Sequence, residues 1–374
     1  MKRRVLVALA TTCLAAGLFA GAAMASEETY VIGLDCPMTG GNAGFGEQMS
    51  LGAQMAVDEV NAAGGIDGVM LELQVQDDKS DPKEAATIAT KFCAMDNCVA
   101  TIGYYNSACC LAALPIINEA KKVSIVTGSN PGISEQNQKY GFRTEPTDNQ
   151  QAVYAGEWMI EDGRQKVAIL YESTDYGMGQ NDIITELIEG AGGEVVCSEA
   201  YILGETKDFT NVLTKVKNAD ADSLFLAGTY TEGAQSAKQQ KALGMDLPMY
   251  SSSSMFEVMF LDAAGDAAEG TKVQGVLVPD DPSEIVQNFE KKYKELFGED
   301  KTAGTFSAHT YAAVMMISDA MKAVGYDEDA MSDYIAETTF DTIYGTVKFN
   351  ETHDLIFDKL TRLQVQDGKF VVIE

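Results

Sequence analysis

Residues 30–66 read YVIGLDCPMTGGNAGFGEQMSLGAQMAVDEVNAAGGI, which places a strand, a glycine-rich turn and a helix in succession. Tyr30 to Asp35 form an apolar run of the length that is typical of a buried strand. From Gly46 to Asn61 the apolar side chains recur at helical spacing. Gly64-Gly65 then ends the helix, because glycine accepts the left-handed conformation of a helix C-cap. A buried strand followed directly by such a helix predicts an α/β unit built on a parallel sheet.

The same alternation continues on both sides of residue 143. Before it, strands are expected at 71–76, 99–103 and 123–126, and one helix starts at Asp81-Pro82, where an Asp cap precedes a Pro. After it, strands at 166–171, 194–201 and 223–227 alternate with helices at 179–191, 208–218 and 233–243. Two such series predict two similar lobes, each with a parallel central sheet covered by helices on both faces.

The first 25 residues have the pattern of a secretory signal peptide. A basic start (Lys2, Arg3, Arg4) precedes an apolar run, and Ala23-Met24-Ala25 has the small residues of a cleavage site. We therefore expect residues 1–25 to be removed and the mature protein to be exported. No later stretch reaches the ~18 apolar residues that span a bilayer, so no direct membrane insertion is expected.

The length and the charge restrict the classes of partner. A chain of 374 residues predicts two or three domains. It carries 27 Lys+Arg against 56 Asp+Glu, a formal net charge of −29, which argues against nucleic acid and against an anionic membrane surface as partners. We interpret the acidity as a feature that favours solubility.

Export would place six cysteines in an oxidising compartment. Cys93 and Cys98 flank a predicted helix end and the next strand, which makes them the best candidates for a local disulfide. The full connectivity stays open among Cys36, Cys93, Cys98, Cys109, Cys110 and Cys197. The only histidines, His309 and His353, lie far from the cysteines in sequence, so we expect neither a metal site nor a cofactor.

Polar and aromatic side chains follow the predicted strands at the edge where open parallel sheets bind ligands. In chain order they are Phe45, Tyr105, Ser107, Thr127, Ser129, Tyr176 and Tyr230. Ser107 could cap the next helix, or its hydroxyl could join the free N–H groups there to hold a carboxylate. Phe45 could equally pack against a helix. Together these side chains predict a ligand cleft between the lobes.

Catalytic groupings are scarce in this sequence. Two histidines leave little for Ser-His or Cys-His chemistry, and neither a G-x-S-x-G elbow nor a G-x-G-x-x-G turn is present. We interpret the serine run 251–254 as a polar loop and His309 as a buried structural histidine. The protein is therefore not expected to be an enzyme.

Taken in order, several segments resemble the type I periplasmic binding proteins of the leucine/isoleucine/valine group, which deliver solutes to ABC importers. They are Pro37-Met-Thr-Gly40, Val57-Asp-Glu-Val-Asn-Ala-Ala-Gly-Gly-Ile66, Gln76-Asp-Asp78 before Asp81-Pro82, Tyr230-Thr-Glu-Gly233, Ala264-Gly-Asp-Ala-Ala-Glu-Gly270 and Thr310-Tyr-Ala-Ala313. The resemblance covers essentially the whole mature chain. It implies two Rossmann-like lobes joined by three crossover strands near 143–147, 276–279 and 352–357. Residues 26–146 and 279–355 would form lobe 1, and residues 147–278 and 356–374 lobe 2.

The resemblance also implies roles for individual residues. In amino-acid-binding members, the ligand carboxylate meets hydroxyls matching Ser107 and Ser129. The ammonium group meets the carbonyl at the position of Thr127, a tyrosine matching Tyr176 and an acidic residue of the second lobe. Aromatic residues matching Phe45 and Phe306 line the side-chain pocket, with Tyr105 and Tyr230 at neighbouring wall positions.

One position departs from the family pattern. The acidic residue falls at Ser253 here, so either Glu232 or Glu257 substitutes for it, or the ligand is not an ordinary α-amino acid. A buried ammonium without a counter-ion would lose several kcal/mol, and Ser253→Asp is therefore expected to improve amino-acid binding.

These observations predict a non-enzymatic, periplasmic solute-binding receptor of an ABC importer. It would capture a small amino acid, or a related carboxylate or amide, between the lobes and present it to the permease membrane subunits. The alternative is a ligand-sensing protein that presents an amide, urea or an aromatic acid to a signalling receptor.

Overall fold

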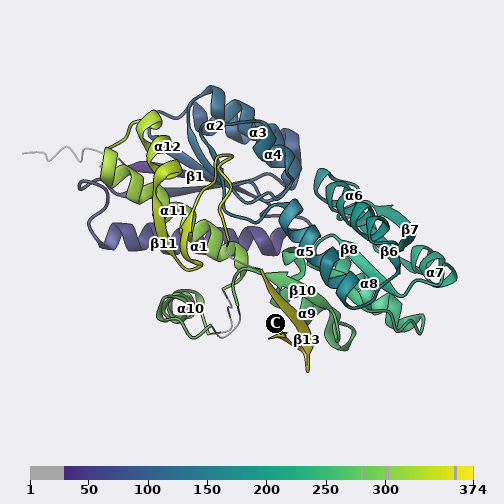
Figure 1. The fold of residues 1–374 in the computed structure, drawn as a ribbon. Coiled ribbons are helices and arrows are strands. Elements are labelled where there is room, and N and C mark those ends of the chain that lie inside the picture. The colour runs from purple at the N-terminus through teal and green to yellow at the C-terminus, as the bar shows by residue number, and fades with distance from the viewer. Residues whose placement is uncertain (1–28, 279–280, 300, 302, 358–359, 374) are drawn as a thin grey trace, which may run out of the picture.

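The computed structural model describes residues 29–278, 281–299, 301, 303–357 and 360–373. The chain forms two α/β bodies that lie side by side (Figure 1). We call the body with the five-stranded sheet the first lobe and the body with the seven-stranded sheet the second lobe. The predicted signal peptide, residues 1–25, lies outside the described residues.

The sheet of the first lobe is parallel throughout, in the order β2-β1-β3-β4-β5. Its strands are β1 (Tyr30–Cys36), β2 (Leu71–Asp77), β3 (Cys98–Gly103), β4 (Val123–Val126) and β5 (Gly141–Arg143). One face carries α1 (Ala43–Ala62) and α11 (Thr305–Val324), and the other carries α2 (Pro82–Cys93) and α3 (Ser107–Glu119). Alternate side chains of β1 enter these two layers, so Ile32 packs with α1 and α11 while Val31 packs beside α2.

The C-terminal end of α1 is set by two glycines that follow it. Gly64 and Gly65 have positive φ angles of 101° and 74°, which side chains with a Cβ rarely adopt. The remaining elements of this lobe are α4 (Gly132–Glu135), α10 (Glu284–Phe297), α12 (Glu328–Glu337) and the antiparallel hairpin of β11 (Thr339–Thr342) and β12 (Gly345–Lys348).

The second sheet has the order β14-β13-β10-β9-β8-β6-β7. Its strands are β6 (Lys166–Glu172), β7 (Glu194–Tyr201), β8 (Ser223–Ala227), β9 (Met249–Ser251), β10 (Lys272–Gly275), β13 (Thr361–Gln366) and β14 (Lys369–Val372). The strands from β6 to β10 pair in parallel, and β13 and β14 add an antiparallel ribbon at one edge. The predicted α/β fold with parallel central sheets is confirmed, and the antiparallel edge is an addition that the sequence did not indicate.

Helices cover both faces of this second sheet. One face carries α5 (Asp148–Glu161) and α6 (Asp175–Gly190), and the other carries α7 (Thr210–Asn218), α8 (Tyr230–Ala242) and α9 (Val258–Ala264). Short 3-10 turns at Ser253–Met255 and Gly265–Ala267 flank α9. The carboxyl ends of β6 and β8 lie at the junction with the first lobe, because Glu172 at the end of β6 and Thr229 after β8 line a cavity together with residues of that lobe.

The chain passes between the two sheets three times. It leaves β5 at Arg143 and enters α5, and it leaves β10 at Gly275 and reaches α10. The third pass starts at Asp354, which pairs with Arg143 in an isolated parallel bridge, and enters β13. The lobe boundaries at residues 146, 278 and 355 stay predictions, and residues 279 and 280 lie outside the described chain.

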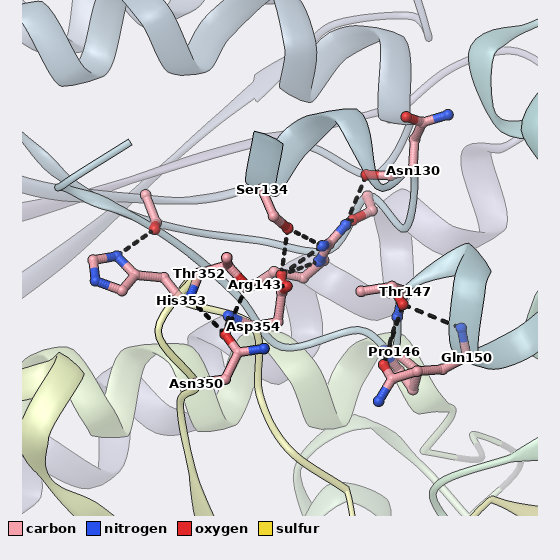
Figure 2. A network of polar contacts seen from close by, with 12 residues as sticks. Asn130, Ser134, Arg143, Pro146, Thr147, Gln150, Asn350, Thr352, His353 and Asp354 are labelled. Carbon is pink, nitrogen blue, oxygen red and sulfur yellow. Dashed lines mark hydrogen bonds and ion pairs between the residues drawn. The ribbon is translucent and has the colours of Figure 1, made fainter. Parts of the chain in front are cut away.

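Two of these passes are joined by a buried polar network, which Figure 2 shows. Arg143, only 1% exposed, donates from Nε to Asp354 Oδ1 at 2.8 Å and from Nη1 to the Asn130 carbonyl at 2.8 Å. Ser134 Oγ donates to the same Asp354 oxygen at 2.7 Å, and Thr352 Oγ1 donates to Oδ2 at 2.9 Å. The network holds the end of β5 against the segment that leads to β13. The crossover after β5 and the crossover before β13 are therefore fixed to each other where they leave the first lobe.

The local disulfide predicted between Cys93 and Cys98 is wrong, because all six cysteines of the described residues are free thiols. Cys98 packs with Val31 and Phe92, whereas Cys93 packs against the separate cluster that contains Cys109. The two side chains therefore enter different parts of the core, although they are close in sequence.

Candidate functional site

A small cavity lies between the lobes at the carboxyl ends of the strands, and we call it the head-group cavity. It is lined by Tyr105, Asn106, Ser107, Thr127, Ser129, Glu145, Gln151, Glu172, Tyr176, Thr229, Ser253, Ser254 and Phe306. Its free volume is about 30 Å³, which is what one or two water molecules need. The structure thus brings together seven of the nine predicted site residues, all except Phe45 and Tyr230.

The first lobe contributes hydroxyl groups and a helix N-terminus. Ser107 is the first residue of α3 and its predecessor Asn106 is the cap, so the interpretation of Ser107 as an N-cap is wrong. Its Oγ instead accepts from the Asn130 backbone N–H at 3.2 Å. Asn106 makes no side-chain cap bond, and the Thr127 hydroxyl donates to the Gly103 carbonyl at 3.4 Å. Hydroxyls beside an uncapped helix N-terminus form a wall that suits a carboxylate.

The second lobe contributes Tyr176, the second residue of α6. Its hydroxyl is hydrogen-bonded to the hydroxyls of Ser252 and Ser254, the latter at 2.8 Å, and Ser254 Oγ donates to the Gly228 carbonyl at 2.7 Å. Burial raises the pKa of Tyr176, so the phenol stays neutral. The serine run therefore holds a tyrosine in place, rather than supplying a nucleophile.

Ser253 belongs to a polar chain that crosses the junction of the lobes. Its hydroxyl donates to Glu145 Oε1 at 2.6 Å, and Gln151 Nε2 donates to the same oxygen at 2.9 Å. On the other side of the carboxylate, His309 Nε2 lies 2.6 Å from Glu145 Oε2, and the imidazole has no exposed surface. These polar contacts run from α11 of the first lobe, through Glu145 on the crossover after β5, to the serine run of the second lobe.

Neither acid suggested by the sequence lines the head-group cavity. Glu232 lies in the first turn of α8 and accepts from Thr229 Oγ1 at 3.1 Å and from the Gly204 N–H at 3.0 Å. Glu257 accepts from Gln48 Nε2 at 2.6 Å and lines a different cavity. Both candidates are therefore wrong for this cavity, because each carboxylate turns toward partners of its own.

The acid that does line the cavity from the second lobe is Glu172, which sequence reasoning missed. It ends β6, its Oε1 accepts from Thr174 Oγ1 at 2.6 Å, and its Oε2 has no hydrogen-bond partner. Burial raises the pKa of Glu172 to about 8, and the charges of Glu232 and Asp148 add to the rise. An acidic residue that closes a buried strand was the available signal for this position.

Four rings, which we call the aromatic cluster, close one side of the cavity. Phe45 stacks on Tyr105 with ring centroids 4.4 Å apart, and it meets Tyr230 at 5.0 Å and Phe306 at 5.1 Å edge to face. Phe45 and Tyr230 thus stand behind the rings that line the cavity. The cluster is an apolar surface next to the polar groups, as a ligand with a polar head and an apolar body requires.

Direct contacts join the lobes around this site. Asn130 Nδ2 donates to the Asp175 carbonyl at 2.7 Å, and Thr231 Oγ1 donates to the Gly41 carbonyl at 3.0 Å. Each bond links the first lobe to the second, so the structure shows the lobes closed upon each other. A cavity of this kind is reached by opening the lobes.

Across the described ranges, no set of three or more His, Cys, Asp or Glu side chains is grouped to bind a metal ion. Within the same part of the chain, every helix is too short or too polar to cross a membrane.

Residues 29–369 match the periplasmic binding protein family, and the chain belongs to that family. The chain is similar to Leu/Ile/Val-binding protein homolog 1 of Brucella suis, with 30% identity over 351 residues that cover 90% of this chain and 92% of the relative. The predicted class, a type I periplasmic binding protein of the leucine/isoleucine/valine group that serves an ABC importer, is confirmed. The matching family is one of binding proteins rather than enzymes.

Two solved structures are similar over 92% of this chain. The branched-chain amino acid transporter substrate-binding protein LivJ of Streptococcus pneumoniae, in complex with isoleucine, is 26% identical, has a TM-score of 0.84 and is covered over 99% of its length. A solute-binding protein of an ABC transporter from Rhodopseudomonas palustris, in complex with 3,4-dihydroxybenzoic acid, is 25% identical, has a TM-score of 0.83 and is covered over 95% of its length.

Proposed function

We propose that the protein is exported, catalyses no reaction, and captures a small α-amino acid or a related carboxylate or amide for delivery to the importer. The observation that supports this best is the head-group cavity, where Ser107 and Ser129 of the first lobe face Tyr176 of the second. A ligand that bonds to both sides holds the lobes together, which is how a hinged receptor retains a solute.

The proposed recognition of the head group uses opposite walls. The ligand carboxylate accepts hydrogen bonds from Ser107, Ser129 and the first N–H groups of α3. The ammonium donates to the Thr127 carbonyl, to the Tyr176 hydroxyl and to Glu172. The free oxygen of Glu172 gives the buried ammonium the counter-charge that Ser253 does not supply.

The charge of the cavity favours an α-amino acid over an acid without an amino group. Glu145 and Glu172 both line the cavity, and a ligand that carries only a carboxylate would bring a third carboxyl group to them without a cation to pair with. The similar structures named above include one in complex with isoleucine and one in complex with an aromatic acid. An aromatic acid is the second candidate, because the aromatic cluster offers rings on which it could stack.

A thermal-shift screen of the mature protein tests the proposal. The panel contains the common amino acids, small amides, urea and aromatic acids, and a ligand raises the melting temperature because it binds only the folded state. Ser107→Ala and Tyr176→Phe should each weaken the best ligand about tenfold, since each removes one hydrogen bond.

Ser198→Ala serves as the matched control, because this hydroxyl is exposed on β7. It should leave the affinity unchanged. If both cavity variants bind as tightly as the unmodified protein, the assignment of the site is wrong.

A further inference from the structure

A second and larger cavity lies between the lobes, and we call it the side cavity. Its volume is about 490 Å³, and it is lined by α1, α9, α10 and the segment that precedes α11. This volume is within the ~300–1,000 Å³ of small-molecule sites. The head-group cavity, at about 30 Å³, has no room for an amino-acid side chain.

Two segments run from one cavity to the other, and a third joins the side cavity to the aromatic cluster. Gly44 lines the side cavity and precedes the first ring of the aromatic cluster. Thr305 lines the side cavity, and the next residue, Phe306, lines the head-group cavity. Ser254 lines the head-group cavity, and Glu257 lines the side cavity three residues later. The aromatic cluster therefore stands between the two spaces.

Tyr105 links the head-group cavity to the rest of the aromatic cluster, because it lines that cavity and stacks on Phe45. Burial raises the pKa of Tyr105, with further contributions from Tyr176 and Glu172 of the head-group cavity and from Glu257 of the side cavity. A ligand that extends beyond the head-group cavity on this side meets these rings, and the side cavity lies next to them.

Two residues that line the side cavity have buried oxygen atoms without hydrogen-bond partners. Glu257 is 3% exposed, and its Oε2 accepts from Gln48 Nε2 at 2.6 Å. The other carboxyl oxygen of Glu257 and the amide oxygen of Gln48 have no hydrogen-bond partner. Buried acceptors without donors are costly, so a ligand group that donates to them recovers free energy. Three lysines, Lys294, Lys301 and Lys369, also line the side cavity, and each of them is at least partly exposed.

We propose that the two cavities form one ligand site and that the side cavity holds the tail of an elongated ligand whose far end donates hydrogen bonds to Glu257 and Gln48. The ligand class is an amino acid or carboxylate with a terminal amine or amide N–H group. This inference rests on the proposed function, since the head group is the one assigned above.

Calorimetric titration of the mature chain tests this with two series of probes. Lysine, norleucine and 2-aminoadipate share one head group and differ at the tail, and 6-aminohexanoate, hexanoate and adipate repeat the comparison without the α-ammonium. In the series that binds, the amine tail should bind at least about tenfold more tightly than the apolar tail, ~1.4 kcal/mol. The anionic tail should bind most weakly.

Variants locate the origin of that preference. Burial raises the pKa of Glu257 to about 8, so this carboxyl must ionise to pair with an amine tail. Glu257→Gln should reduce the advantage of the amine tail to within about twofold, since an amide cannot ionise. Asp266→Asn removes an equal charge from an exposed site of the same lobe and should leave the preference unchanged. Leu51→Trp fills the side cavity and should weaken norleucine far more than alanine. Circular dichroism confirms that each variant is folded.

The outcomes separate this inference from the proposed function. Equal affinity for lysine and norleucine, a preference for the anionic tail, or a preference that survives in Glu257→Gln overturns the inference and leaves the function standing. The inference is also overturned, and the function left standing, if alanine or acetate binds and none of the longer probes does. The absence of binding by every probe overturns both.

Discussion

Glu172 has one carboxyl oxygen bonded to Thr174 and one without a partner, and burial raises its pKa to about 8. In the empty cavity the carboxyl is therefore neutral below pH 8, whereas an α-ammonium requires it to be ionised. Amino-acid binding should release a proton in that range. We expect the affinity to rise between pH 6 and pH 8, by at most about tenfold per unit, and then to level off.

Calorimetry at pH 6, 7, 8 and 9 measures this effect. Glu172→Gln should bind about 50-fold more weakly at pH 8, as expected for the loss of a charge-assisted hydrogen bond, and its affinity should not change with pH. Asp182→Asn, at an exposed position of α6, should behave as the unmodified protein. An affinity of the unmodified protein that stays constant from pH 6 to pH 8 would show that Glu172 does not pair with the ligand.

The surroundings of Ser253 change the effect that we expect of Ser253→Asp on amino-acid binding from tighter to weaker. The family resemblance favours an acid at this position, but Glu145 Oε1 lies 2.6 Å from the Ser253 hydroxyl. A second carboxylate there would repel the first. We expect the variant to bind amino acids about tenfold more weakly and to melt at a lower temperature, and tighter binding in a titration would refute this.

At the scale of elements, the crossovers depend on the ion pair of Arg143 with Asp354. Asp354→Asn keeps the shape of the side chain but leaves a buried guanidinium without its counter-charge. Urea denaturation should show a loss of about 3 kcal/mol in the free energy of unfolding. The control is Asp333→Asn, whose ion pair with Lys139 is exposed and should be worth less than ~1 kcal/mol. Equal losses in the two variants would contradict a structural role for the network.

The end of β1 carries a second buried polar feature, the carboxyl groups of Asp35 and Asp78. Burial, and then the charge of Asp78, raises the pKa of Asp35 to about 10. The folded protein therefore keeps a proton that the unfolded chain releases above about pH 4. Because the folded state binds more protons, stability should fall as the pH rises from about 4 toward 10.

Asp35→Asn removes that requirement, so its free energy of unfolding should decrease less between pH 6 and pH 9 than that of the unmodified protein. Asp96→Asn, an exposed substitution in the same lobe, should retain the original slope. Denaturation at three pH values in this range measures the slopes, and identical slopes for Asp35→Asn and the unmodified protein would exclude this account of the carboxyl pair.

At the scale of the whole molecule, the strand-helix alternation could be predicted because its signals are local. The strand expected at 166–171 is β6 (Lys166–Glu172), and the Asp81-Pro82 start is a true helix cap, with Asp81 Oδ1 accepting from the Lys83 N–H. The antiparallel direction of β13 could not be predicted, because its partner β10 lies some ninety residues earlier and nothing in either strand records the direction.

The sequence could predict those site residues that follow the ends of strands. Ser107, Ser129 and Tyr176 come directly after strands, and the geometry of parallel sheets gathers them at one edge. Glu145 could not be selected among 56 acidic residues, since only the fold brings it to the cavity, whereas the place of Glu172 at the end of a buried strand was a usable signal. Ser253 was placed through the family resemblance, but its bond to Glu145 depends on contacts between distant segments.

The most direct measurement of the central proposal is a crystal structure of the mature protein with the tightest amino acid from the screen. We predict ligand density between the lobes, with the carboxylate within hydrogen-bond distance of Ser107 and Ser129 and the ammonium next to Tyr176 and Glu172. Ligand density elsewhere on the molecule, or between the lobes without contact to Ser107 or Tyr176, would contradict it.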